Sequence, residues 1–450
     1  MSFQGKRVVV LGLARQGVAL ARYLARRGAR VAVSDLKPAE ALGPQLAELA
    51  DLTIEYILGG HPESLLDGAD LLCLSGGVSA DVPLAQEARR RGIPLSNDSQ
   101  LFLEATPARV IGITGSAGKT TTTTLVGEML KAEGGSSIWV GGNIGNPLIA
   151  EVDRMRQGDL ALMELSSFQL QIMTVSPQVA AVLNLTPNHL DRHGTMEAYL
   201  EAKSHILRYQ VPDGIAILGH DDPGARARAP LVRGRLHWFS AQVAVVAGAY
   251  LRGEAVMLRS GGPEAQVCAV AEIRLRGRHN LLSVLAACAI AAAVGVPPEA
   301  MRQAIRYFTG VEHRLEFVGE RRGIRWYNDS IATAPERAIA GMASFDEPMV
   351  LLAGGRDKKL PWDEFARQVR KRVRHLVVFG EARGLIEAAV RAEGFEAITA
   401  CERMADAVEA AARIARPGEV VLLAPGGTSF DEFGDFAERG VRFRELVNRL

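Results

Sequence analysis

The residues best suited to chemistry lie in the segment 110–121, which reads VIGITGSAGKTT. A β-branched run, a glycine turn, a lysine and a row of threonines are typical of a strand, loop and helix that hold a nucleotide phosphate. Backbone N–H groups and the helix start attract the anion, Lys119 neutralises charge, and Thr120 can bind Mg²⁺. The strict pattern has another glycine where Ile113 stands, so this is a shorter TGxxGKT form, and an ordinary strand–helix turn is the alternative. We expect an ATP site made of Gly115, Ser116, Ala117, Gly118, Lys119, Thr120 and Thr121.

Two later segments place further polar groups after apolar strands. In MELSSFQL (163–170), Glu164 ends an apolar run, where a carboxylate can hold Mg²⁺ directly or through water. A capping or solvent-exposed glutamate is the alternative. The segment NLTPNHLDRH (184–193) has two histidines, an aspartate and an arginine in a loop, a density that favours a functional site.

Lys203 follows on a predicted helix and is one of few lysines in an arginine-rich chain. Unlike a guanidinium, its amine can lose a proton and react with CO₂ to form a carbamate that binds Mg²⁺. A solvent-exposed helix lysine is the alternative.

The first turn of the chain, GLARQG (12–17), imitates a dinucleotide-binding fingerprint, and Asp35 falls where an acid would meet a ribose hydroxyl. Ala14 replaces the middle glycine and narrows access to a pyrophosphate. The candidates are NAD, a nucleotide-bearing substrate, and a plain strand–helix turn.

Other polar or glycine-rich clusters lie beside apolar elements, where α/β domains place ligands. Arg314 could neutralise a transferring phosphoryl group, and Lys358 could bind a carboxylate. The clusters are GRHN (277–280), HRLE (313–316), YNDSIAT (327–333), GGRDK (354–358) and APGGTSFD (424–431).

Alternating apolar strands and helices must position these groups. The pattern predicts an α/β chain with three domains in series: a Rossmann-like N-terminal domain, a central phosphate-loop ATPase-like domain and a C-terminal Rossmann-like domain. We place the boundaries at 1–105, 106–310 and 311–450. The expected helices lie at 18–27, 281–294 and 405–414, and the segment 211–276 is broken by glycines and left unassigned. The expected strands lie at 7–11, 30–34, 71–74, 93–95, 160–163, 179–183, 349–352, 375–379 and 420–423.

The composition excludes several classes of protein. The formal net charge of +1 argues against nucleic-acid or membrane partners, and no apolar stretch is long enough to span a bilayer. The four cysteines lack metal-ligand spacing, so we expect reduced thiols in a cytoplasmic protein. We also expect a monomer.

Taken together, these motifs resemble those of the Mur ligases, the ATP-dependent amide-forming enzymes of peptidoglycan precursor synthesis, over essentially the whole chain. ELSSFQL, NLTPNHLDRH, NDSIAT and TSFDEFGDFAERG are similar to the signatures of the branch that adds D-glutamate. The resemblance implies a ligase that joins D-glutamate to UDP-N-acetylmuramoyl-L-alanine through an acyl phosphate, with ATP and two Mg²⁺ ions. The alternative functions are another Mur ligase that adds a different residue, an NAD-dependent dehydrogenase and an ATPase motor.

The resemblance also implies residue roles. Lys119, His189, Lys203 and Arg314 would be catalytic, and Asn280, Arg314 and Asp329 would complete the ATP site. Thr120 and Glu164 would hold one Mg²⁺, and His189 with carbamylated Lys203 (N6-carboxylysine) would hold the second. The UDP-substrate would be bound by Ala14, Arg15, Gln16, Asp35, Ser75, Asn143, Ser166 and His189. D-Glutamate would be bound by Thr333, Lys358, Ser429, Phe430 and Phe436.

The chain departs from the family pattern at three places. Ile331 stands where many relatives carry lysine, which removes a cationic contact. Ser116-Ala117 replaces the usual Thr-Asn pair, and Arg15 and Gln16 differ from the expected residues of the uridine site.

Overall fold

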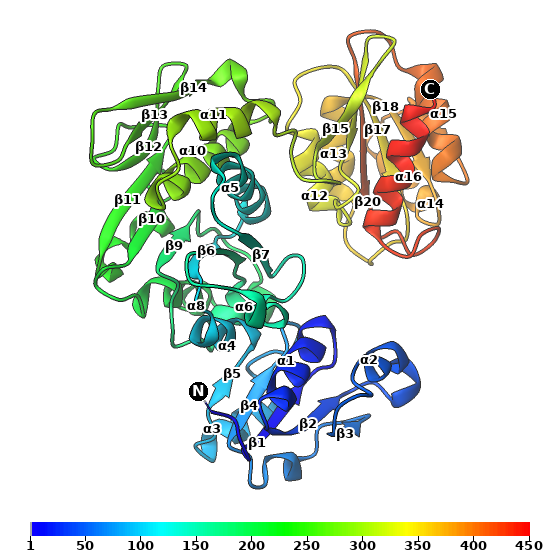
Figure 1. The fold of residues 1–450 in the computed structure, drawn as a ribbon. Coiled ribbons are helices and arrows are strands. Elements are labelled where there is room, and N and C mark those ends of the chain that lie inside the picture. Colours follow the sequence, from blue (N-terminus) through cyan, green and yellow to red (C-terminus); the bar gives the residue numbers. More distant parts are fainter. Residues whose placement is uncertain (1) are drawn as a thin grey trace. The chain divides into compact units, whose positions relative to one another are not determined.

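The computed structural model describes residues 2–450, apart from the side chain of Asp191. The fold contains three β-sheets, which confirms the expected three-domain α/β architecture (Figure 1). The chain divides into two compact units. The N-terminal unit is the chain up to Ile273 together with His279–Arg306, and the C-terminal unit is Arg274–Arg278 together with Tyr307–Leu450.

The first sheet of the N-terminal unit has five parallel strands in the order β3-β2-β1-β4-β5. The strand order reverses between β1 and β4, which creates the crevice where open α/β sheets bind ligands. The strands are β1 (Arg7–Leu11), β2 (Arg30–Asp35), β3 (Ile54–Leu58), β4 (Leu71–Leu74) and β5 (Leu95–Ser96). The helices are α1 (Arg15–Arg26), α2 (Gly43–Glu48), α3 (Pro83–Arg90) and α4 (Asp98–Ala105).

Helix α1 begins at Arg15 rather than at the expected Val18. Gly17 is therefore a helical residue and not part of the turn. A Cβ atom on Gly17 would lie 1.9 Å from the carbonyl oxygen of Gly12, so only glycine lets the helix approach the end of β1 this closely. The second glycine of the motif serves close helix–strand packing.

The second sheet of the N-terminal unit has nine strands in the order β14-β13-β12-β11-β10-β9-β6-β8-β7. In this order, all neighbouring strands between β7 at one edge and β12 are parallel, and the pairs β12–β13 and β13–β14 are antiparallel. The strands are β6 (Arg109–Thr114), β7 (Ile138–Gly142), β8 (Leu160–Glu164), β9 (Val179–Val182), β10 (Ile215–Gly219), β11 (Arg235–Ser240), β12 (Gly248–Arg252), β13 (Ala255–Arg259) and β14 (Ala265–Ala269). The helices are α5 (Lys119–Glu133), α6 (Ser167–Leu170), α7 (Leu190–His193), α8 (Met196–Arg208), α9 (Pro223–Arg226), α10 (Arg278–Ala293) and α11 (Pro298–Tyr307).

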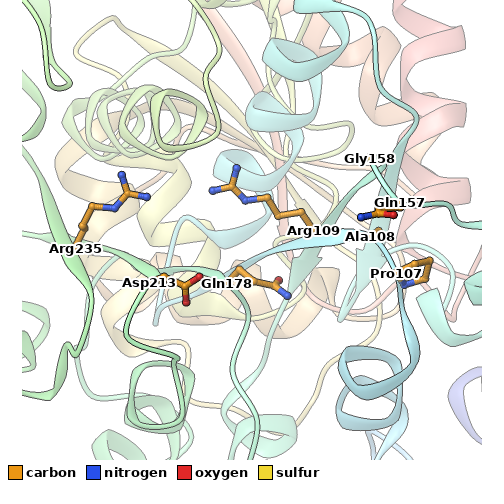
Figure 2. Close-up of a pocket in the computed structure, with 9 residues that line it drawn as sticks. Pro107, Ala108, Arg109, Gln157, Gly158, Gln178, Asp213 and Arg235 are labelled. Carbon is orange, nitrogen blue, oxygen red and sulfur yellow. The ribbon is translucent and has the colours of Figure 1, made fainter.

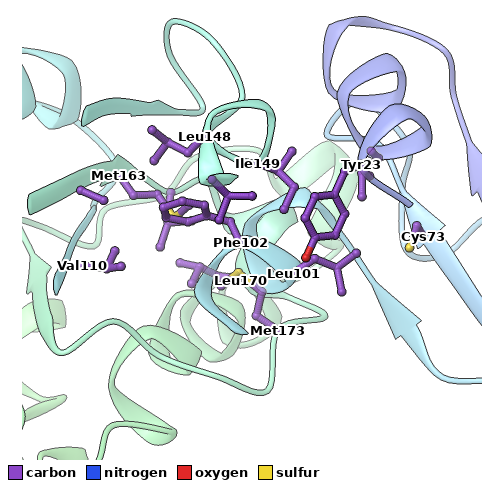
Figure 3. Close-up of a cluster of buried hydrophobic side chains, with 14 of the residues drawn as sticks. Tyr23, Cys73, Leu101, Phe102, Val110, Leu148, Ile149, Met163, Leu170 and Met173 are labelled. Atoms are coloured by element: carbon purple, nitrogen blue, oxygen red, sulfur yellow. The ribbon is translucent and has the colours of Figure 1, made fainter. Parts of the chain in front are cut away.

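A single apolar core joins the two sheets of the N-terminal unit. Phe102 of α4 is fully buried in the same cluster as Leu148, Ile149 and Met163 from the second sheet region, and Tyr23 of α1 belongs to it as well (Figure 3). Burial of large apolar side chains is the main stabilising contribution to such packing. The first two expected domains therefore share one core.

The sheet of the C-terminal unit has the order β15-β16-β20-β17-β18-β19, parallel except for the β15–β16 hairpin. Two apolar clusters cover its two faces. The strands are β15 (Glu316–Arg321), β16 (Ile324–Asn328), β17 (Met349–Gly354), β18 (Val373–Phe379), β19 (Ile398–Ala400) and β20 (Val420–Gly426). The helices are α12 (Pro335–Met342), α13 (Asp363–Arg372), α14 (Arg383–Ala392), α15 (Met404–Ile414) and α16 (Phe436–Asn448).

Across residues 2–450, no helix combines the length and apolarity that a bilayer crossing requires. The four cysteines are free thiols, as expected, and three of them are buried.

Candidate functional site

The phosphate-binding motif forms the predicted strand–loop–helix between β6 and α5. Gly118 precedes the helix in a left-handed conformation with φ of 80°, which favours glycine. Asn184, after β9, clamps the loop: its Oδ1 accepts from the N–H of Ala117 (2.8 Å) and its Nδ2 donates to the Ala117 carbonyl (3.1 Å). The first N–H groups of a helix lack acceptors within the helix, so the start of α5 provides an anion site.

Glu164 lies beside this helix start, at the end of the neighbouring strand β8. It is only 2% exposed. Thr120 Oγ1 donates to Glu164 Oε2 (2.9 Å), and Asn143 Nδ2 donates to Glu164 Oε1 (2.9 Å). Carboxylate, hydroxyl and amide oxygens are the ligands that Mg²⁺ prefers, so this donor set fits a magnesium ion at the phosphate loop.

Lys203 of α8 is buried behind the loop, 2% exposed. Its Nζ donates to Thr114 Oγ1 (3.0 Å) and to the Gly115 carbonyl (3.1 Å). Burial and, next, the nearby Lys119 ammonium lower the pKa of Lys203 well below its usual value, although Glu164 opposes the shift. The environment therefore favours the neutral amine, the form that reacts with CO₂.

His189 precedes α7 in a left-handed backbone conformation with φ of 53° and is exposed. Its ring lies edge-on to the ring of Phe168 at 5.3 Å between centroids, and the ring of His193 stacks on Phe168 at 5.1 Å. His193 is also within 2.9 Å of Ser167 Oγ. Within the described residues, no three His, Cys, Asp or Glu side chains are grouped to hold a metal, so a second Mg²⁺ site at His189 and Lys203 stays a prediction.

In the first sheet, the predicted UDP-substrate residues converge on the carboxyl end of β1. Asp35 accepts hydrogen bonds from the N–H groups of Leu13 (2.7 Å) and Lys37 (2.9 Å). Gln16 Oε1 accepts from the Gly76 N–H (2.9 Å), directly after the buried Ser75. These contacts connect the loops after β1, β2 and β4 around the crevice, with Ala14 and Arg15 exposed at the start of α1.

Ser166 links the two sheets of the N-terminal unit. Its hydroxyl caps α6, and Gln169 Oε1 accepts a hydrogen bond from the Ser166 N–H (3.0 Å). Gln169 Nε2 in turn donates to Ser99 Oγ (2.9 Å), and the Gln169 backbone carbonyl accepts from Asn97 Nδ2 (2.9 Å). Asn97 caps α4, which contains Ser99 and follows the last strand of the first sheet.

Within the C-terminal unit, Arg314 and Asp329 lie on neighbouring segments. Asp329 follows β16, and its Oδ1 accepts from the Leu315 N–H (3.1 Å). Burial raises the pKa of Asp329 to about 6, although Arg314 acts in the opposite direction. Asn280 belongs to the N-terminal unit, so a shared ATP site stays a prediction.

The predicted amino-acid residues occupy loops at the carboxyl ends of adjacent strands in the same unit. Lys358, after β17, donates to Thr333 Oγ1 (3.1 Å), after β16. Ser429, after β20, is buried, whereas Phe430 is 59% exposed. Phe436 begins α16 with its ring edge-on to His313 at 6.3 Å.

Sequence reasoning missed several residues that shape these sites. Tyr199 of α8 hydrogen bonds Ser116 Oγ (2.7 Å), and Thr114 accepts from Lys203. Asp98, buried at the start of α4, accepts from Gln16 Nε2 (3.3 Å). Thr114 and Asn184 lie inside motifs that we identified, whereas Asp98 has no local sequence signal.

A hollow of ≈ 480 Å³ lies at the opposite, amino-terminal edge of the second sheet (Figure 2). Arg109, Gln178 and Arg235 line it, at or just before the starts of β6, β9 and β11. Because open α/β sheets bind ligands at the carboxyl ends of their strands, this hollow is separate from the predicted site.

Comparison with known proteins identifies three matching domain families along the chain. Residues 6–97 match the Mur ligase MurD-like N-terminal domain, residues 113–291 the Mur ligase middle domain, and residues 313–427 the Mur ligase glutamate ligase domain.

Curated relatives match over nearly the full length. The chain is 45% identical over 449 residues to UDP-N-acetylmuramoylalanine–D-glutamate ligase of Symbiobacterium thermophilum, covering 99% of this chain and 98% of the relative. It is 42% identical to the protein of the same name from Pelotomaculum thermopropionicum, covering 100% and 98%. Among solved structures, UDP-N-acetylmuramate–alanine ligase of Thermotoga maritima matches with a TM-score of 0.58 at 19% identity, covering 99% of both chains, which supports the fold.

Proposed function

The chain belongs to the Mur ligase family, and from that membership we propose that it joins D-glutamate to UDP-N-acetylmuramoyl-L-alanine with the hydrolysis of ATP to ADP and phosphate. The observation that carries the proposal is the 45% identity, over 449 residues, to a ligase of that name. The Thr120–Glu164 pair at the phosphate loop supports the ATP-dependent part of it.

The chemistry explains why a phosphate site is needed. A carboxylate resists attack by an amine because oxide is a poor leaving group. Transfer of the γ-phosphoryl group of ATP to a carboxylate oxygen of the muramoyl-alanine substrate releases ADP and gives an acyl phosphate. The D-glutamate amine then attacks the acyl carbon, the C–O bond to phosphate breaks, and the ammonium proton passes to solvent. Positioning and charge neutralisation are therefore the protein's tasks.

The chain's own residues fit these tasks. The start of α5 and Lys119 would bind the nucleotide phosphates, with Arg314, Asn280 and Asp329 as further contacts. Thr120 and Glu164 would hold Mg²⁺, which when bound neutralises phosphate charge.

Lys203 would serve this site as a carbamate. Its burial favours the neutral amine, and addition of CO₂ would create a carboxylate-like group close to the Gly115 carbonyl. With His189, this group would supply the ligands of a second Mg²⁺. The anionic carbamate would also lie beside Lys119, whose positive charge would favour it.

The substrate-binding roles complete the proposal. The crevice at β1 and β4, with Asp35, Gln16 and Ser75, would bind the UDP part, and Asn143 and Ser166 would contact the muramoyl part. Thr333, Lys358, Ser429, Phe430 and Phe436 would bind D-glutamate. We propose a monomer that works in the cytoplasm, without membrane or nucleic-acid partners.

The test is a matched set of incubations with Mg²⁺-ATP, UDP-N-acetylmuramoyl-L-alanine and one amino acid at a time. Phosphate release and a product heavier by one glutamyl residue should require D-glutamate. Lys119→Ala should abolish both. If the chain uses another amino acid efficiently, it is a Mur ligase that adds a different residue, and the proposal is wrong. Phosphate release without any amino acid would indicate an ATPase.

A further inference from the structure

Arg439 of α16 is a buried cation that the proposed function does not use. Its side chain is 0% exposed, among the largest fully buried side chains of the chain. Burial lowers the pKa of Arg439 to about 10, so the guanidinium remains charged at neutral pH. Removing a guanidinium from water is costly unless its donors and its charge are compensated.

The guanidinium is bonded to the loops that carry the proposed amino-acid residues. Nε donates to Ser330 Oγ (3.0 Å), and Nη2 donates to the carbonyls of Ser330 (2.9 Å) and Gly427 (3.2 Å). Ser330 is three residues before Thr333, and Gly427 is two residues before Ser429. Arg439 therefore fixes the loops after β16 and β20 to one planar group.

The third loop, after β17, packs against the same guanidinium. A Cβ atom on Gly355 would lie 2.9 Å from Arg439 Nη1, so this position leaves room only for glycine. Lys358 follows in this loop, and Arg439 contributes to lowering the pKa of Lys358, after burial and Arg337. The two cations are thus close enough to repel each other.

The charge of Arg439 is incompletely compensated. Among the described residues, Nη1 has no hydrogen-bond partner, and the bonds of the guanidinium all go to neutral oxygens. Asp431 and Glu432 act on it only at a distance. An anion bound beside Lys358 would relieve the repulsion between the two cations.

We propose that Arg439 is a positioning and specificity residue of the amino-acid site, which aligns the loops of Thr333, Lys358 and Ser429 and makes the site select an amino acid with a second carboxylate. The inference rests on the proposed function. Arg439 acts through its hydrogen bonds to the loops and through the electrostatic effect of its positive charge, and it does not touch the reacting atoms.

The experiment compares two variants. Arg439→Met keeps much of the side-chain volume but removes the charge, and Arg439→Lys keeps the charge but loses the planar set of guanidinium N–H donors. Because an interaction with a charged group is involved, Arg439→Met should raise the KM for D-glutamate at least about 10-fold. The KM for ATP and for the UDP-substrate should change less than about 2-fold, within the range of surface substitutions. Arg439→Lys should recover part of the affinity for D-glutamate.

The matched control is Arg442→Met, three residues further along α16, where the arginine side chain is 41% exposed and paired with Glu445. It should leave all three KM values unchanged. Inhibition by D-glutamine, which lacks the second carboxylate, separates charge from structure. Arg439→Met should weaken D-glutamate much more than D-glutamine, so the preference between them should shrink.

Equal weakening of D-glutamate and D-glutamine, or equal loss in both Arg439 variants, would reduce Arg439 to a structural residue and overturn the proposal. If Arg439→Met fails to fold, Arg439→Lys decides: an unfolded lysine variant also overturns it. A wild-type chain that does not use D-glutamate would instead refute the proposed function.

Discussion

At the scale of single residues, one carbonyl oxygen organises the phosphate loop. The Gly115 carbonyl accepts from Lys119 Nζ (2.9 Å) and from Lys203 Nζ (3.1 Å). Two ammonium groups at one oxygen repel each other, so the buried Lys203 is the one driven toward its neutral form. Lys119, in the first turn of α5, is the lysine that we propose binds the nucleotide phosphates.

Lys203→Ala should therefore remove catalysis without removing the fold. We expect kcat to fall at least about 100-fold, the usual effect of losing one electrostatic group in an active site. Formate should restore part of the rate because it can occupy the space of the carbamate. Phosphate release with increasing formate measures this.

Lys131→Ala is the control, since Lys131 of α5 is exposed and paired with Glu128. It should keep full activity. A correctly folded Lys203→Ala chain that formate does not rescue would contradict the carbamate.

Asp98 is the second informative single residue. Its carboxyl is 2% exposed, Oδ1 lacks a partner among the described residues, and burial raises its pKa from the ordinary 3.8 to about 6. The folded chain therefore retains a proton that the unfolded chain has already lost between these pH values. Stability that is present below about pH 4 is lost as the pH rises through 6.

Asp98→Asn should remove this dependence. The unfolding free energy of the asparagine variant relative to the original chain should increase by about 2 kcal/mol between pH 4 and pH 7. Urea unfolding of both chains at several pH values measures the difference. Two parallel curves would contradict the assigned titration.

At the scale of elements, close packing rather than turn formation explains the second glycine of the first motif. Gly17 lies inside α1, where a Cβ atom would meet the Gly12 carbonyl at 1.9 Å. Any side chain there would push the helix away from β1 and disturb the crevice that Gln16 and Ser75 line.

Gly17→Ala should destabilise the chain by about 1–3 kcal/mol, the usual cost of overpacking, and should weaken binding of the UDP-substrate. Gly43→Ala is the matched control, because Gly43 begins α2 with no atom within 4 Å of an added Cβ. Its effect should stay within about 1 kcal/mol and can be stabilising. Thermal melts and titration calorimetry measure both, and a neutral Gly17→Ala would contradict the packing argument.

The sequence predicted those elements whose apolar runs are continuous, and it predicted the phosphate loop because that site is contiguous. Strand β1 lies where the pattern placed it, and α15 begins one residue earlier. The strands β10 to β14 lie in the segment 211–276, which was left unassigned because glycines interrupt it. Buried and half-exposed residues alternate in β13, whereas β10 is a continuous buried run that was missed. Asp98 carried no local signal. Arg439 lies within the signature TSFDEFGDFAERG but was given no role, because distant loops create its burial.

At the scale of the whole molecule, the proposed ATP residues are divided between the two units. Lys119 belongs to the N-terminal unit and Arg314 to the C-terminal unit. If both act on one nucleotide, their effects must be coupled, because each neutralises charge on the same phosphates.

A double-mutant cycle tests this coupling. Lys119→Met and Arg314→Met should each weaken binding of Mg²⁺-ATP, and the double variant should differ from the sum by about 1 kcal/mol or more. Titration calorimetry gives the affinities. Additive effects would mean that the two side chains serve different ligands.

The shared core of the N-terminal unit has a consequence for inhibitors. Because Phe102, Leu148 and Ile149 belong to one core cluster that joins the two sheets, we expect a constant span between the proposed uridine site at β1 and β4 and the phosphate loop. A single compound that tethers a uridine group to a phosphate mimic could thus be built with a stiff spacer of one length. Its two ends would bind with a high effective concentration and a small loss of conformational freedom.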